Sequence, residues 1–288
     1  MKEILNRFLT KPVQMFRRHK AKTALTQFTS HKHPKINALG DALHESLNHT
    51  IYTEEQNWIK SIEQRRSNLL HSKEEIAQID YGAGESRSNR TKEEMRNGVR
   101  SVTLVANVCK FSKSPFWATF LFKMIRKLEP TSCVELGSCV GVSASYLSAA
   151  LKINGKGNLL SLEGSPEIAK IAQETLDKLD LHNGSVIVGP FHETLEGVLE
   201  SAKPVDFFFN DGHHDHFAVI QYFNESLPYL ADEAVIVFDD ISYSPGMRKA
   251  WTQIEDDERV SVSIDLQTVG IVLVGKNLAT KEKFRIPL

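Results

Sequence analysis

The chain has 288 residues, and its 35 basic and 36 acidic side chains nearly cancel. A chain of this length can bury the core of one large α/β domain together with an appendage. The balanced charge does not indicate a nucleic-acid partner, and none is expected. The three cysteines lack metal-type spacing, and no apolar run reaches about eighteen residues, so we expect a soluble, cytoplasmic protein.

The first residues are strongly basic. Met1–Ile36 contains nine Lys or Arg residues and one acidic residue, Glu3, which gives this arm a net charge of +8. Such an arm can bind weakly to an anionic membrane surface, and it has the acid-poor composition of a transit peptide. A solvated helical extension has the same composition, and the sequence favours that interpretation.

Residues 1–100 are predicted to form a helical N-terminal extension, and residues 101–288 the main domain. No strand pattern is seen before about residue 110. Thr53–Gln56 has the form of a capping box ahead of apolar residues at helical spacing. The composition of Asp80–Arg90 predicts a loop, and Tyr81–Asn89 within it either covers the site as a lid or only links two helices. Further helices are predicted over Lys92–Val108 and Pro115–Leu128.

From Ser132 onward, short apolar runs alternate with helical patterns, which is typical of a parallel sheet covered by helices on both faces. The predicted strands are 132–136, 158–162, 184–188, 205–209, 233–238, 260–265 and 271–274. The predicted helices are 141–152, 165–180, 191–200, 215–229 and 244–255. The last two strands are too close for a helical crossover, so they must pair antiparallel. We therefore expect a doubly wound, mostly parallel α/β sheet of seven strands, with the last strand antiparallel.

The turn after the first of these strands has the composition of a nucleotide-binding loop. It reads Glu135-Leu136-Gly137-Ser138-Cys139-Val140-Gly141, and its glycines permit close approach of a ligand to the start of a helix. Glu163, at the tip of the next strand, is placed to accept hydrogen bonds from ribose hydroxyls. Cys139 and Val142 stand where a dinucleotide-binding loop has glycines, which argues against a nicotinamide cofactor. Glu135 suits a ligand that carries an ammonium group.

Acidic residues follow the fourth and fifth predicted strands. These are Asp211 and the pair Asp239 and Asp240. Because the carboxyl ends of parallel strands meet at one edge of the sheet, the three carboxylates are expected to converge there and to need a cation. Oxygen ligands of this number favour Mg²⁺, although Asp239 and Asp240 could instead cap a helix. Zinc is disfavoured, because His214 and His216 have no cysteine nearby and are outnumbered by carboxylates.

Other side chains near these motifs are expected to be structural. His192 and His213 are expected at the surface of a helix or turn, whereas Tyr243, Met247 and Trp251 recur at helical spacing and are expected to face the core.

Together these motifs resemble class I S-adenosylmethionine-dependent methyltransferases of the catechol O-methyltransferase type, and more closely the bacterial group that includes macrolide-sugar O-methyltransferases. The resemblance covers about residues 101–276. It is carried by Glu-Leu-Gly-x-x-x-Gly-x-Ser at 135–143, Glu163, Gly189-Pro190-Phe191, Asp-Gly-x-His at 211–214 and Phe-Asp-Asp at 238–240. His216 and Ser242-Tyr243 depart from the pattern of the closest relatives, which bears on the substrate more than on the reaction.

The resemblance implies a role for each matching residue. The implied cofactor-binding residues are Glu135, Gly137, Ser138, Gly141, Ser143, Glu163, Gly164 and Phe191. Of these, Glu163 would bind the ribose and Phe191 would lie near the adenine. Asp211, Asp239 and Asp240 would hold the divalent ion, and His214 would be the general base, with Asp211 the second catalytic residue.

The sequence therefore predicts S-adenosylmethionine-dependent O-methylation of a hydroxyl on a small molecule, assisted by Mg²⁺ or another divalent ion. Metal coordination lowers the pKa of a hydroxyl, and an imidazole can take its proton near neutral pH. One alternative is a metal-independent N- or O-methyltransferase. Another is a non-catalytic membrane-surface or scaffold protein with a degenerate fold. The sequence does not identify the methyl acceptor, and it allows a homo-oligomer.

Overall fold

The structure is a computed structural model that describes residues 25–26, 28–82, 90–275 and 281–288. Most of the predicted basic arm and most of the predicted lid loop lie outside the described residues. No helix of the described residues has the length and apolarity of a membrane span.

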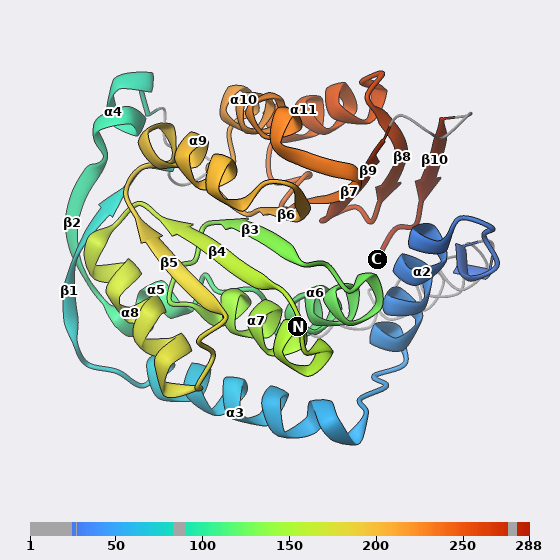
Figure 1. The fold of residues 1–288 in the computed structure, drawn as a ribbon. Coiled ribbons are helices and arrows are strands. Elements are labelled where there is room, and N and C mark those ends of the chain that lie inside the picture. Colours follow the sequence, from blue (N-terminus) through green and yellow to red (C-terminus); the bar gives the residue numbers. More distant parts are fainter. Residues whose placement is uncertain (1–24, 27, 83–89, 276–280) are drawn as a thin grey trace, which may run out of the picture.

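A large sheet forms the centre of the molecule (Figure 1). Its eight strands lie in the order β10-β8-β9-β7-β6-β3-β4-β5. Their bounds are β3 (Ser132–Leu136), β4 (Asn158–Glu163), β5 (Gly184–Val188), β6 (Val205–Asn210), β7 (Leu230–Phe238), β8 (Val260–Asp265), β9 (Gly270–Val274) and β10 (Glu282–Arg285). β9 runs antiparallel to both of its neighbours, and the other pairings are parallel. The doubly wound sheet is thus confirmed, with one strand more than the seven predicted.

The strand order places a crevice at the carboxyl end of β3. β3 pairs with β4 on one side and with β6 on the other. The strands that follow β3 are therefore added first on one side of it, and the later strands are added on the opposite side. In open α/β sheets, ligands bind where the strand order reverses in this way. The turns that follow β3, β4, β6 and β7 therefore meet at one edge of the sheet.

Helices cover both faces of this sheet. In Figure 1, α9, α10 and α11 lie on one face and α6, α7 and α8 on the other, with α3 outside α7. The helices are α2 (Pro34–Leu47), α3 (Thr53–Leu70), α4 (Lys92–Asn97), α5 (Val105–Cys109), α6 (Pro115–Leu128), α7 (Val142–Asn154), α8 (Pro166–Lys178), α9 (Phe191–Ala202), α10 (His216–Ser226) and α11 (Pro245–Asp256). All five helices predicted beyond residue 140 are present, with ends that differ by a few residues.

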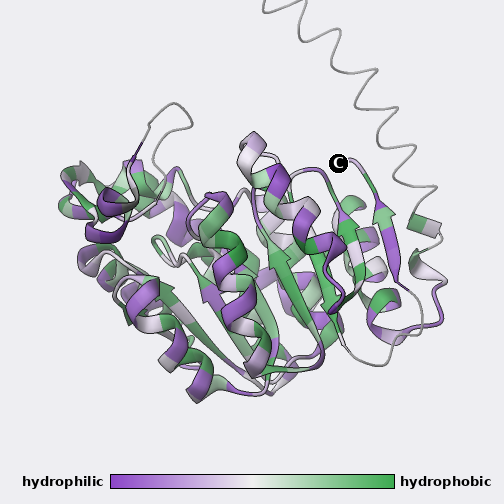
Figure 2. Ribbon diagram, turned by 90° about the horizontal axis from the view of Figure 1, so that it is seen from above, coloured by the Kyte–Doolittle hydropathy of each residue, from purple (hydrophilic) through white to green (hydrophobic). Residues whose placement is uncertain are grey.

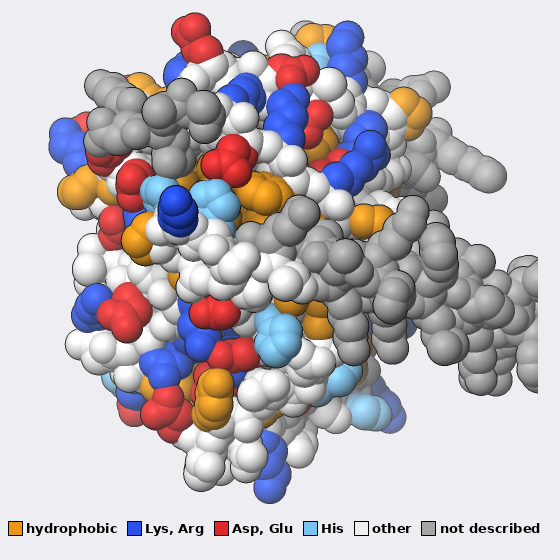
Figure 3. Space-filling view, turned by 90° about the vertical axis from the view of Figure 1, so that its right-hand side faces the viewer, with side chains coloured by type: hydrophobic (Ala, Val, Ile, Leu, Met, Phe, Trp, Pro, Cys, Tyr) orange, Lys and Arg blue, Asp and Glu red, His pale blue; other side chains and the backbone are white. Residues whose placement is uncertain are grey.

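Apolar side chains pack on both faces of the sheet. Within β6, Phe207 and Phe209 belong to one hydrophobic cluster and Phe208 to the other, as the alternation of side chains along a strand requires. Figure 2 shows this apolar interior in green, with mixed colours on the helices around it. On the face shown in Figure 3, acidic and basic side chains are interspersed.

The prediction that no strand precedes about residue 110 is wrong. β1 (Glu75–Asp80) and β2 (Val99–Leu104) pair antiparallel. The helix predicted over Lys92–Val108 is divided, because Gly98 ends α4 with a φ of +73° and the chain then enters β2. The predicted domain boundary, between residues 100 and 101, falls inside β2.

Candidate active site

The turn after β3 packs closely against two neighbouring segments. Gly137 has a φ of +92°, and a Cβ there would lie 2.6 Å from the backbone oxygen of Asp211. Gly141 has a φ of +84°, and a Cβ there would lie 2.7 Å from the backbone oxygen of Ala172. Residues other than glycine are therefore excluded at both positions. The first contact also joins the predicted cofactor loop to the acidic loop after β6.

Glu135 lies at the end of β3 and has no exposed surface. The hydroxyl of Ser161 donates a hydrogen bond of 2.5 Å to its Oε2 and lies 2.5 Å from the hydroxyl of Ser138. Ser143, in the first turn of α7, is also close to this carboxyl group. The other oxygen, Oε1, is buried and has no hydrogen-bond partner in the described part of the chain. Burial raises the pKa of Glu135 to about 7. A buried carboxylate with an unused oxygen fits the ammonium group expected here.

Glu163 ends β4 and lies against the cofactor loop. Its Oε2 accepts a hydrogen bond of 3.0 Å from the backbone N–H of Cys139, and its Oε1 accepts one of 3.0 Å from Ser165. Burial raises the pKa of Glu163 to about 7, although these backbone donors oppose the rise. Each carboxylate oxygen can accept a second hydrogen bond, so the group can still bind ribose hydroxyls.

Aromatic rings form the wall beside this loop. The ring of Phe191, at the start of α9, packs edge-on against His213 at 5.5 Å and Tyr222 at 5.8 Å between centroids. Gly212 lies beneath it, since a Cβ there would lie 2.3 Å from the ring. His213 lies in the turn after β6, as expected, but its side chain is only partly exposed. Its Nδ1 lies 2.7 Å from the hydroxyl of Tyr222, and burial lowers its pKa.

Tyr81 reaches the same wall from the N-terminal extension. A Cβ on Gly164 would lie 2.6 Å from the Tyr81 ring, so the ring lies directly against this glycine. The Tyr81 backbone also forms a hydrogen bond with His213, which opposes the lowering of the His213 pKa by burial. The sequence assigned Tyr81 only to a loop, and no local pattern marks it as part of the site.

Asp211 and Asp239, which follow β6 and β7, converge on Lys113. The Nζ of Lys113 contacts Oδ2 of Asp239 directly and lies 3.5 Å from Oδ1 of Asp211. The exposed fraction of these side chains is 12% for Lys113, 0% for Asp239 and 15% for Asp211. Burial raises the pKa of Asp211, and the charges of Lys113 and His214 oppose the rise. No sequence motif marks Lys113, which lies well before the alternating strands and helices.

His214 lies between two carboxylates at the mouth of this cluster. Its Nε2 is 3.9 Å from Oδ1 of Asp211 and 3.8 Å from Oδ2 of Asp240. Asp240 has a φ of +51° in the turn after β7. The ring of Tyr243 lies 5.5 Å from the imidazole, and Tyr243 is 40% exposed, so its expected place in the core is wrong. His214 thus combines a partly open position with a carboxylate on each of two sides.

The three predicted metal ligands do not assemble into a metal site. The ammonium of Lys113 lies against both Asp211 and Asp239, and Asp240 faces His214. Across the described ranges, no group of three or more His, Cys, Asp or Glu side chains is arranged to hold a metal ion. A divalent ion between these carboxylates would be repelled by the lysine at short range. With Lys113 between them, these carboxylates do not fit Mg²⁺. The ion therefore stays a prediction from the sequence.

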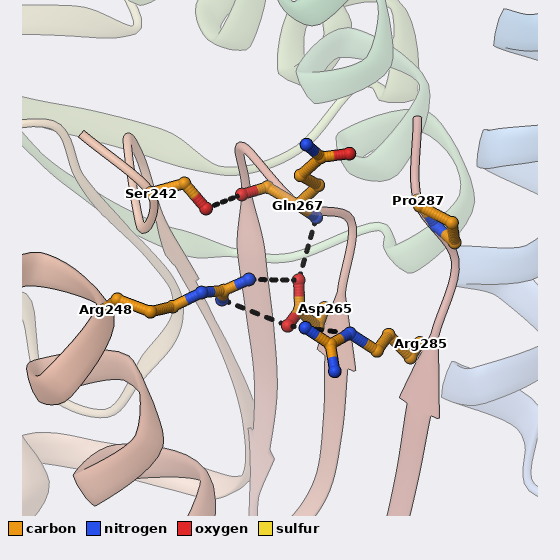
Figure 4. A pocket seen from close by; sticks show the side chains of 6 residues that line it. All are labelled: Ser242, Arg248, Asp265, Gln267, Arg285 and Pro287. Atoms are coloured by element: carbon orange, nitrogen blue, oxygen red, sulfur yellow. Dashed lines mark hydrogen bonds and ion pairs between the residues drawn. The ribbon is translucent and has the colours of Figure 1, made fainter. Parts of the chain in front are cut away.

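A cavity of about 210 Å³ lies near the turn after β7. Figure 4 shows Asp265 between two arginines in its wall. Oδ2 of Asp265 lies 3.0 Å from Nη1 of Arg248 and 3.7 Å from Nε of Arg285. Ser242, Gln267 and Pro287 complete the lining. Two guanidinium groups share one carboxylate, so the cavity wall carries an excess of positive charge.

The expectation that Met247 and Trp251 face the core is confirmed. Each of these residues is 2% exposed. The three cysteines are free thiols, with Cys109 and Cys133 buried and Cys139 partly buried.

Known proteins similar to this chain are methyltransferases. Residues 134–241 match a family model described as a methyltransferase domain. The catechol O-methyltransferase of Niastella koreensis is 28% identical over 138 residues, which are 47% of this chain and 61% of that protein. The chain therefore spans less than two thirds of that relative.

Solved structures share the fold. An O-methyltransferase from Bacillus cereus in complex with S-adenosylhomocysteine (SAH) is 24% identical, with a TM-score of 0.51 over 59% of this chain and 86% of that one. An SAH-bound methyltransferase from Podospora anserina is 17% identical, with a TM-score of 0.52 over 58% of this chain and 82% of that one. Residues 134–241 of this chain therefore match a methyltransferase domain, and the fold is shared with SAH-bound methyltransferases of known structure.

Proposed function

We propose that this chain transfers a methyl group from S-adenosylmethionine to a hydroxyl oxygen of a small molecule. The buried carboxylate of Glu135 carries the proposal, because its unused Oε1 lies at a glycine turn and suits the ammonium group of the cofactor. The catechol O-methyltransferase of Niastella koreensis supports oxygen as the methylated atom.

The positions of the surrounding residues support the roles that the resemblance implies. Glu135 and Ser143 would hold the methionine end, and Glu163 would bind the ribose hydroxyls. Phe191 would lie beside the adenine, in the aromatic wall shared with His213 and Tyr222. The acceptor would enter next to His214, at the open side of the acidic cluster.

The reaction is an in-line displacement that depends on positioning. S-adenosylmethionine supplies an electrophilic methyl carbon bonded to a sulfonium. His214 takes the proton of the acceptor hydroxyl, the oxygen forms a bond to the methyl carbon, and the carbon–sulfur bond breaks with its electron pair left on sulfur. A positive charge near the oxygen helps this step by lowering the pKa of the hydroxyl. The sequence predicts a divalent ion for this purpose, and the described residues offer Lys113.

The test separates cofactor binding from chemistry. Calorimetry should show SAH binding to the wild-type protein, and Glu163→Gln should weaken it about tenfold, as expected for losing a charge-assisted hydrogen bond. Transfer of a labelled methyl group should be screened with catechols, sugars and hydroxylated lipids. His214→Asn should lower turnover by about 10²-fold or more while SAH affinity is kept. Wild-type protein that does not bind SAH would refute the cofactor, and transfer only to nitrogen acceptors would refute the hydroxyl.

A further inference from the structure

We propose that the ammonium group of Lys113 is the resident cation of the acidic site and takes the place of the divalent ion predicted from the sequence. The catalytic part of this inference rests on the proposed methyl transfer. The part that concerns metal binding does not, and it can be tested on its own.

The charges of the site are arranged around Lys113. Its Nζ contacts Oδ2 of Asp239 and lies 3.5 Å from Oδ1 of Asp211, so one ammonium bridges the turns after β6 and β7. These are two of the three carboxylates from which a divalent ion was predicted. Because Asp239 is fully buried, its charge must be compensated inside the protein, and Lys113 does so.

The backbone of Lys113 is fixed from outside the loop in which it lies. Nη1 of Arg66, on α3, donates a hydrogen bond of 2.6 Å to the Lys113 carbonyl oxygen. Arg66 is itself only 8% exposed and pairs with Glu63 at 3.0 Å. Two residues after Lys113, Pro115 begins α6. Lys113 is thus held between two helices, unlike a surface lysine on a free loop.

Apolar side chains surround the stem of Lys113. Lys113 and Asp239 line a small cavity with residues of α6, of the sheet and of the turn before β9, namely Trp117, Phe120, Leu121, Met124, Phe209, Val237 and Val269. An ion pair is screened less in such surroundings than in water. Admitting a metal ion would therefore require breaking a weakly screened ion pair between Lys113 and Asp239.

The ammonium also has a donor to spare. It carries three N–H groups, of which two face the carboxylates of Asp211 and Asp239. The third can donate to the oxygen of an acceptor placed next to His214, where it would stabilise the negative charge that develops as the proton leaves. Lys113 would then act as a catalytic residue in direct contact with the acceptor.

Removing the ammonium should turn this cluster into a metal site. In Lys113→Met, both oxygens of Asp239 become available, because Oδ1 is already buried without a hydrogen-bond partner among the described residues. The matched control is Lys110→Met, in the same loop, since Lys110 is exposed and its side chain bonds that of Asn107 at 2.8 Å. Each protein is titrated with Mn²⁺ in the presence of SAH, and free Mn²⁺ is measured by electron paramagnetic resonance. Methyl transfer is measured with EDTA and with Mg²⁺.

The wild-type and Lys110→Met proteins should bind Mn²⁺ weakly and keep their turnover in EDTA. Lys113→Met should bind Mn²⁺ at least about tenfold more tightly, because two carboxylates lose their internal cation. In EDTA its turnover should fall by about 10²-fold, with part of the loss recovered in Mg²⁺.

Three results would each overturn the proposal. These are tight Mn²⁺ binding by the wild type, EDTA-sensitive wild-type turnover restored by Mg²⁺, or Lys113→Met with unchanged Mn²⁺ affinity. SAH binding by the variant shows that it is folded, and Lys113→Gln serves if the methionine variant is not. If no acceptor is ever methylated, the proposed function fails, and the Mn²⁺ titrations still decide the identity of the cation.

Discussion

Gly137 is the residue at which the cofactor loop comes closest to the acidic loop. Its φ of +92° and the 2.6 Å from a Cβ to the Asp211 backbone oxygen both oppose a side chain. We expect Gly137→Ala to lose about 1–2 kcal/mol of stability from backbone strain and about 1–3 kcal/mol more from the collision. It should also weaken SAH binding. The measurement is urea denaturation with and without SAH.

Gly155 provides the matched control. Its φ is +71°, but a Cβ there would meet nothing within 4 Å. Gly155→Ala should therefore carry the strain alone and leave SAH affinity unchanged. If both variants lost the same stability and bound SAH equally well, the close approach at Gly137 would not constrain the site.

Individual site residues were predictable where a strand fixes them. Glu135, Glu163, Asp211 and Asp239 all stand at strand ends, and the carboxyl ends of parallel strands meet at one edge whatever the details of packing. Lys113 escaped prediction for the opposite reason. It reaches the acidic cluster only because distant segments position it, and a sequence window around it contains no sign of that.

At the level of elements, Lys123 joins α2 and α3 to α6. It has no exposed surface, and its Nζ lies 2.5 Å from Oε2 of Glu55 and 2.8 Å from Oε2 of Glu45. The ring of Tyr52 lies 4.5 Å from the same ammonium. We expect Lys123→Met to destabilise the protein by about 3–5 kcal/mol, because two carboxylates would stay buried without their main partner. Urea denaturation measures the loss.

The control for this prediction is Lys156→Met. Lys156 pairs with Glu129 at 2.9 Å, but these side chains are 44% and 59% exposed, so their loss should cost less than about 1 kcal/mol. Comparable losses for the two variants would mean that the buried cluster does not hold the helices together. Because α3 also carries Arg66, loosening it should disturb the position of Lys113.

The elements missed from the sequence share a physical cause. β1 and β2 pair with each other across a predicted loop, and each is short enough to be mistaken for part of a helix or linker. β10 has the sequence Glu-Lys-Phe-Arg, whose single apolar residue is typical of a strand at the edge of a sheet. Such strands depend on their pairing partners, whereas β3 to β7 carry their own hydrophobic pattern.

On the scale of the whole molecule, the alternation of strands and helices was enough to predict the doubly wound sheet and the crevice at the end of β3. It was not enough to predict how the N-terminal extension contributes to that crevice. Tyr81 lies against Gly164, and Arg66 holds Lys113 from α3. These contacts join segments that are far apart in the sequence. The contact of Tyr81 belongs to the cofactor side of the candidate site, and that of Arg66 to the acidic cluster.

The stability of the whole protein should depend on pH through two carboxyls of the cofactor site, Glu135 and Glu163. The pKa values of Glu135 and Glu163 are raised from 4.5 to about 7, mainly by burial. The fold therefore favours their protonated forms. The stability that they contribute is present in full below pH 4.5 and is lost as the pH rises to about 7. The loss is about 3 kcal/mol for each carboxyl.

Bound SAH should offset this loss, because its ammonium group would pair with the ionised form of Glu135. We expect the free energy of unfolding of the ligand-free wild type to fall more steeply between about pH 5 and pH 8 than that of Glu135→Gln, whose side chain does not titrate. With saturating SAH, the free energy of unfolding of the wild type should depend less on pH. SAH should raise the free energy of unfolding of Glu135→Gln less than that of the wild type. Urea denaturation across this range, with and without SAH, measures all four curves. If wild type and variant fell in parallel, Glu135 would be ionised at neutral pH without a ligand, and an internal cation would have to be found for it.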